Sequence, residues 1–122
     1  MAMSADPIGQ LLRREGHLPL TIEDRPRLDA LLAAHPALLA GLRDALALAA
    51  KHFPAAAEIR LVVLGDPDLP EEGDHLTVEI WTVDPPAPTR SRHAALVRDW
   101  VALHPECATL PLVIGPRYRQ VS

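Results

Sequence analysis

The chain has 122 residues, 48% hydrophobic and 23% charged, which suffices for a single domain with a buried core. Twelve basic and sixteen acidic side chains give a net charge of -4, so nucleic acid is not an expected partner. No uncharged run approaches the roughly 18 to 20 residues that cross a bilayer, and no membrane span is expected. One cysteine excludes an internal disulfide, and with no secretion signal in the sequence we expect a cytoplasmic protein.

The first part of the chain predicts three helices. Asp6 followed by Pro7 is a typical helix start, and it predicts a short amphipathic helix over 7–15. The pair Thr21 and Asp24 resembles a capping box, which predicts a second helix over 22–34. A third helix is expected over 36–53, where Leu38 and Leu48 widen the apolar surface beyond one stripe. Either a core helix or a dimer face would have this wider surface.

The second half of the chain changes to an extended pattern. Residues 58–64 and 75–83 are expected to be strands joined by a long acidic loop, and the proline-rich residues 84–90 are expected to form a connector. Thr89 or Ser91 then caps a predicted helix over 91–104. A last strand is predicted over 110–115, with Pro111 at a strand start or at a sheet edge, because proline cannot donate to a ladder.

These elements predict an α+β fold in which N-terminal helices precede a β-β-α-β unit, with a small three-stranded sheet and helices on one face. The last two strands are expected to run parallel if they are neighbours, because a helix connects them. We expect a single domain, 1–122, with its core over 22–115, a helix and connector over 1–20, and a tail over 116–122. Whether the N-terminal helix packs on this domain or on a partner stays open.

The loop between the two strands is the densest polar cluster in the sequence, with five carboxylates: Asp66, Asp68, Glu71, Glu72 and Asp74. Their order does not match the calcium-binding loop of an EF-hand, so no metal site is predicted. The segment VVLG, followed after the loop by LTVEI, resembles the nucleotidyltransferase pattern. This resemblance would imply a metal-dependent enzyme. However, no serine follows Gly65, and the paired acids of that pattern are missing. A solvated turn is therefore the first interpretation, and a small enzyme using these acids is the alternative.

Other catalytic patterns are also missing. The six histidines include no pair four residues apart, as a helical zinc site would need, and helix capping is the simpler interpretation of four of them. Cys107 has no evident base beside it, and no glycine-rich phosphate loop is present. We expect neither a metal nor a cofactor, and an enzymatic role is uncertain, with the sequence leaning against it.

The tryptophan in the second strand suggests an interaction surface. Alternation along the strand places Leu76, Val78 and Ile80 on one face, and it places Glu79 and Trp81 on the other. A large aromatic side chain on an uncovered sheet face is a candidate interface anchor. The interface candidates are therefore Trp81 and Glu79, together with Leu38 and Leu48 on the third helix.

The segment from Pro54 to Gly115, with LVVLGDPDLPEEGDHLTVEIWT followed by RHAALVRDWVALHP, resembles small uncharacterised bacterial α+β proteins of helix, hairpin, helix, strand order. Such proteins have no assigned activity, so the resemblance implies a fold and no catalytic residue. We therefore expect a small binding or accessory module that acts through protein contacts or self-association, plausibly as a homodimer. An antitoxin-like partner protein is a further alternative, and a small-molecule ligand is unknown.

Overall fold

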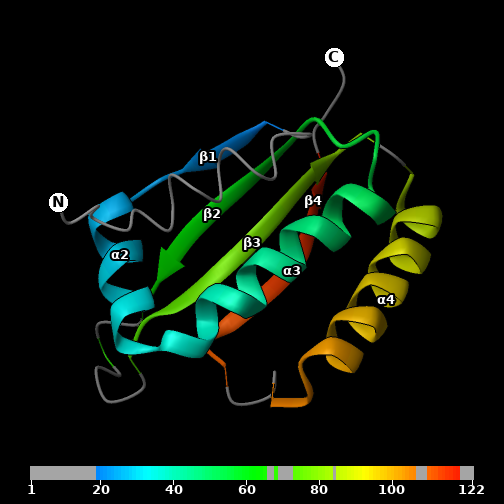
Figure 1. Cartoon of the computed structure of the whole chain (residues 1–122). Coiled ribbons are helices and arrows are strands. Elements are labelled where there is room, and N and C mark those ends of the chain that lie inside the picture. Colours follow the sequence, from blue (N-terminus) through cyan, green and yellow to red (C-terminus); the bar gives the residue numbers. More distant parts are fainter. Residues whose placement is uncertain (1–18, 66–67, 69–72, 84, 107–109, 119–122) are drawn as a thin grey trace, which may run out of the picture.

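The computed structural model describes residues 19–65, 68, 73–83, 85–106 and 110–118, in which four strands and three helices form an α+β fold (Figure 1). The strands form one sheet in the order β1-β2-β3-β4. In chain order the elements are β1 (Leu20–Ile22), α2 (Arg25–Ala34), α3 (Pro36–His52), β2 (Glu58–Leu64), β3 (His75–Thr82), α4 (Pro86–Leu103) and β4 (Leu112–Tyr118). The predicted helix over 7–15 lies outside the described residues.

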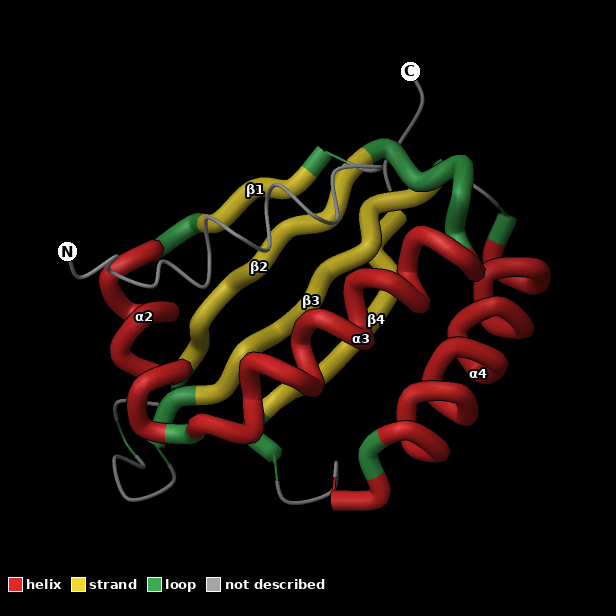
Figure 2. Tube along the Cα trace, in the orientation of Figure 1, coloured by secondary structure: helices red, strands yellow, loops and turns green. Residues whose placement is uncertain are grey.

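The three described helices lie on one side of the sheet (Figure 2), and the core lies between the two layers. Alternation along β2 and β3 supplies the sheet's half of this core, with Leu61, Val78 and Ile80 almost completely buried. Leu42 and Phe53, from α3 and the residue that follows it, are also fully buried. The expected placement of helices on one face therefore agrees with the structure.

The sheet has four strands instead of the expected three. β1 pairs parallel with β2 through residues that were expected to be connector and helix start. The pairing continues beyond the strand, because Ile59 N–H donates to the carbonyl of Pro19 and Glu23 N–H donates to the carbonyl of Leu61. Three residues are too few to give a period in the sequence, so only their pairing with a distant strand identifies them.

The helix starts follow local chemistry. The side chain of Asp24 caps α2 by accepting from the backbone N–H of Arg27 at 3.2 Å, so α2 begins at Arg25 and not at residue 22. Thr21, the other half of the expected capping box, is in β1 instead. α3 begins at Pro36 and ends at His52, within one residue of its prediction.

The connector predicted over 84–90 is wrong over most of its length, because α4 begins at Pro86. Prolines are compatible with a first helical turn, whose N–H groups have no partner within the helix. Thr89 is inside the helix, and its hydroxyl donates to the carbonyl of Pro85 at 2.8 Å. The proline cluster thus starts the helix earlier than the serine or threonine cap would.

The last strand runs to Tyr118, so the tail predicted from residue 116 is wrong for its first three residues. β4 pairs parallel with β3, as expected from the helix between them, and it forms an edge of the sheet. Leu76 N–H donates to the Pro111 carbonyl, and because backbone groups alternate in direction along a strand, Ile114 and Pro116 point outward. His93 Nε2–H of α4 donates to the Ile114 carbonyl at 2.8 Å, and Pro116 has no N–H. Both features protect this edge from further strand pairing.

No single described helix is both long and apolar enough to cross a membrane. α2 and α3 reach that length and composition only as a pair, and the chain bends by 119° between them.

Candidate interaction surface

The structure separates the four interface candidates. Leu38 is fully buried and Leu48 is 9% exposed, so both belong to the core beneath α3 and neither presents a side chain to a partner. Of the two interpretations of that helix, its wider apolar surface fits a core helix. Glu79 and Trp81 lie on the sheet face opposite the three described helices, hereafter the open face.

The open face consists of four cross-strand rows fixed by the strand register. From one end to the other, the rows are Leu64 with His75; Val62 with Thr77 and Val113; Thr21 with Arg60, Glu79 and Gly115; and Glu58 with Trp81 and Arg117. The first two rows are mainly apolar and the last two are charged and aromatic. The face therefore has two halves of different chemistry.

Trp81 is half-buried and is held by two neighbours. Its Nε1–H donates to Glu79 Oε1 at 3.1 Å, two residues earlier on the same strand. The guanidinium carbon of Arg60 on β2 lies 5.1 Å from the centre of the indole ring, within the range of a cation–π interaction. The ring is consequently oriented before any partner arrives, which lowers the entropy lost on binding.

Ion pairs extend from this tryptophan toward both edges of the sheet. Arg60 contacts Glu58 at 3.2 Å and Glu23 at 3.5 Å, and Thr21 donates its hydroxyl to Glu58 at 3.1 Å. On the other side, Arg117 Nε donates to Glu79 Oε2 at 3.4 Å. Such pairs contribute little stability where they are exposed, but they fix a pattern of charge that a partner can recognise.

The apolar half of the open face includes two exposed side chains, Val113 at 53% and Leu64 at 43%. Val62 is in the same row as Val113, on the other side of Thr77. In the next row, a Cβ built at Gly115 on β4 would meet no atom of the described residues within 4 Å. Exposed aliphatic side chains beside a tryptophan and two arginines are the composition typical of interface centres.

The two arginines of this surface were not among the candidates from the sequence. Arg60 alternates with buried Ile59 and Leu61, and that period could have placed it on the open face. Arg117 was assigned to a tail, and only the extension of β4 past Pro116 brings it beside Trp81.

The acidic loop is described only in part. Asp66, Glu71 and Glu72 lie outside the described residues, and Asp68 is exposed. Asp74 is engaged with α2, where Arg27 donates through Nε at 3.1 Å and through Nη2 at 3.0 Å. This guanidinium holds the pKa of the Asp74 carboxyl below its usual range. Among the residues that the structure describes, no group of three or more His, Cys, Asp or Glu side chains could hold a metal ion.

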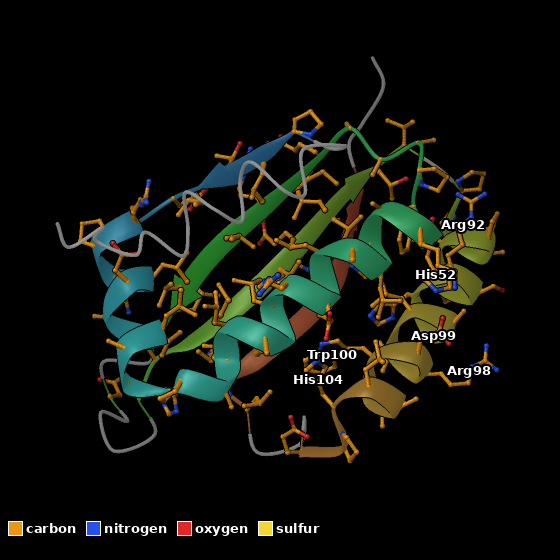
Figure 3. All side chains as sticks on the ribbon, viewed as in Figure 1. His52, Arg92, Arg98, Asp99, Trp100 and His104 are labelled. Carbon is orange, nitrogen blue, oxygen red and sulfur yellow. The ribbon has the colours of Figure 1, made fainter. Side chains whose placement is uncertain are left out.

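A second polar cluster joins α3 and α4 (Figure 3). It consists of His104 with Asp44 and Glu106, and of His52 with Asp99, and is hereafter the helix seam. His104, which caps the C-terminus of α4, places Nε2 2.6 Å from Asp44 and Nδ1 3.2 Å from Glu106. Only the doubly protonated imidazolium donates through both nitrogens. The hydrogen bond to Asp44 raises the pKa of His104 above its ordinary value; burial opposes this rise, and the bond to Glu106 adds to it.

The helix seam has a second pair, His52 with Asp99 at 2.9 Å, in which the two side chains point toward each other (Figure 3). The hydrogen bond from His52 lowers the pKa of Asp99, and nearby Lys51 and Arg98 act in the same direction. Between the two pairs, Trp100 Nε1–H donates to the Gly41 carbonyl at 2.9 Å. When both nitrogens of His104 donate to these carboxylates, the imidazole links α3 to the end of α4 as a charged group.

Comparison of the chain with models of protein families, with curated proteins and with solved structures finds no match. The resemblance to small bacterial α+β proteins therefore stays a prediction, and the function has to be argued from the surface itself.

Proposed function

We propose that the chain is a protein-binding module whose recognition surface is the open face around Trp81. The observation that carries this proposal is the pre-oriented indole, held by Arg60 and Glu79 on a sheet face opposite the described helices. Tryptophan and arginine are the residue types most enriched among binding hot spots, and pre-orientation lets their burial contribute fully to affinity.

The apolar half of the face gives the module its second component. Burial of Val113 and Leu64, which are 53% and 43% exposed, would supply a non-directional driving force of about 25 cal/mol per Å² of apolar surface covered. The charged rows then supply orientation, because arginines and carboxylates in fixed positions tolerate few arrangements of a partner. An antitoxin-like or accessory role would use a surface of this kind.

The enzyme alternative receives no support from the described part of the acidic loop. Asp74 is paired at both oxygens with Arg27, which gives this carboxylate a structural role between α2 and the start of β3.

The proposal is tested by site-specific photocrosslinking in the native host. A benzophenone amino acid replaces Val113 on the open face, and in a matched control it replaces Leu103, which is 58% exposed on α4. We expect a discrete protein-protein product from position 113, which Trp81→Ala abolishes, and none from position 103. A Trp81→Ala chain that keeps its circular dichroism and cooperative unfolding shows that the loss is not caused by misfolding.

Two results would contradict the proposal. One is the absence of any product at position 113, and the other is a product that forms equally well from position 103 and survives Trp81→Ala.

A further inference from the structure

We infer that the partner of the open face is a second copy of this chain, packed face to face about a two-fold axis that runs along β3. This inference rests on the proposed function, because it names the partner of the same surface. It is carried by the way the side chains on β2 match those on β4, on the two sides of β3.

A two-fold axis along β3 lays β2 of one copy over β4 of the other, and it sets each β3 residue against its own counterpart. Such an interface uses the same patch on both copies, so every contact away from the axis occurs twice. Sheets that pack face to face keep their strands within about 30° of each other, which this arrangement allows. The register of the rows then dictates which residues meet.

The first match is a pair of opposite charges. Glu58, Trp81 and Arg117 form one row, and the second copy presents the same row in reverse order. In this arrangement Glu58, whose side chain is 15% exposed, lies opposite Arg117 of the second copy, whose side chain is 52% exposed. The two-fold repeats this pair on the other side of the axis, while Trp81 meets its counterpart, as stacked aromatic side chains favour.

The second match is one of shape. Arg60 shares a row with Glu79 and Gly115, so it lies over Gly115 of the second copy, where the missing side chain leaves open space. The guanidinium of Arg60 stays within its own chain, over the Trp81 ring and beside Glu58 and Glu23. The two Glu79 carboxylates face each other across the axis, and their repulsion is offset because each is paired with Arg117 of its own chain.

The third match is apolar. Val62 and Val113 occupy the two ends of one row, with Thr77 between them. The rotation places Val62 against Val113 of the second copy, which covers the most exposed aliphatic side chain of the face. Side chains on β2 and β4 therefore match in three rows: Glu58 with Arg117, the long Arg60 with Gly115, and Val62 with Val113.

The size of the face sets the expected strength. From strand spacing and rise, β2, β3 and β4 present about 400 Å² in plan, below the roughly 800 Å² that each partner buries in a standard interface. We therefore expect a weak dimer that exchanges with monomer as the protein is diluted, and not an obligate one.

The test uses full-length chains in which Cys107→Ser removes the native thiol. One chain also has Val62→Cys, another has Val113→Cys, and a control has Leu103→Cys on α4. Each chain alone and each mixture is treated with a short bismaleimide, and light scattering over a dilution series reports the mass. We expect covalent dimer from the mixture of Val62→Cys with Val113→Cys and little from either chain alone. Trp81→Ala in both chains should reduce that product about tenfold, as loss of a hot-spot side chain does.

Other results overturn the inference in distinguishable ways. Linking of each chain to itself, with no heterodimer of Val62→Cys and Val113→Cys in the mixture, would place the two-fold axis across the strands instead of along them. Monomer at every concentration, with a different protein crosslinked to position 113 in the host, would overturn self-association and leave the proposed function standing. No product in either experiment would remove both.

Discussion

The two tryptophans show how the two sides of the sheet differ. Trp100, on the helix side, is 5% exposed and donates to a backbone carbonyl at Gly41, so its indole is part of the fold. Trp81, on the open face, is half-buried and donates to a side chain, Glu79, while an arginine lies over its ring. Trp100 is thus held by the backbone of a neighbouring helix, whereas Trp81 is held by two side chains at the surface. We therefore expect Trp100 to stabilise the fold and Trp81 to contribute to binding.

The largest expected effect comes from removing the buried tryptophan. Trp100→Ala should lower the free energy of unfolding by about 3 to 5 kcal/mol, because it leaves a cavity and removes the indole's hydrogen bond to the Gly41 carbonyl. Trp81→Ala should cost much less, because that ring is already partly in water. Urea unfolding of the two variants measures the difference, and equal losses would contradict the separation of roles.

The helix seam should make stability depend on pH. The pKa of His104 is raised in the folded chain, so its contribution is fully present below the ordinary histidine pKa and is lost as pH rises through the folded value. The free energy of unfolding should therefore fall as pH rises from slightly acid to mildly alkaline. Asp44→Asn, which removes the principal cause of the shift, should flatten this dependence, and a variant with the full dependence would show that the seam is not its source.

At the acid side of the profile the sign reverses. The pKa of Asp99 is lowered in the folded chain, so its contribution is present above the ordinary aspartate pKa and is lost as pH falls through the folded value. His52→Gln removes the first cause of that shift and should weaken the loss of stability at low pH. The measurement is acid unfolding followed by circular dichroism, with the exposed Asp29→Asn as a control.

A smaller effect is expected at the edge of the sheet. His93→Leu removes the donor that reaches the Ile114 carbonyl, which should cost about 1 kcal/mol, as for one hydrogen bond. It should also raise the rate of hydrogen exchange along β4 more than along β2. Unchanged exchange along β4 would show that the histidine does not protect this edge.

The smallest effect concerns the ion pair of Arg27 with Asp74, which links α2 to the start of β3. A Cβ at Gly65 would lie 2.2 Å from Asp74 Oδ1, so Gly65→Ala should displace the carboxylate that Arg27 holds. If so, Gly65→Ala should cost less in a chain that already has Asp74→Ala than in the natural chain. A double-mutant cycle by urea unfolding measures this coupling, and strictly additive losses would exclude it.

Sequence periodicity identified the elements that are long and regular. β2 was predicted with its observed ends, and the alternation in β3 placed Trp81 and Glu79 on the correct face. β1 was missed because its three residues are held by pairing with β2 and not by a pattern of their own. The start of α4 was misplaced because prolines that open a helix look, in sequence, like prolines that prevent one.

The candidate surface was predictable only in its central strand. Alternation could have added Arg60, but Arg117 required the full length of β4, which Gly115 and Pro116 disguise as a strand end. Asp44, the partner of His104 on α3, is 60 residues away in the chain, so no local spacing indicates it. Contacts between elements distant in sequence are what periodicity cannot supply.

The strand order also has a consequence for how the chain folds. The β2–β3 hairpin joins neighbours in sequence, whereas both parallel pairings, β1 with β2 and β3 with β4, must wait until the helices between them have closed a long loop. Local contacts form sooner than distant ones, so the hairpin that holds Arg60, Trp81 and Glu79 should be structured early in the folding reaction. The strands β1 and β4 would then pair with the hairpin in separate steps. During synthesis, the Trp81 indole would therefore be exposed before β4, which includes Arg117, pairs with β3.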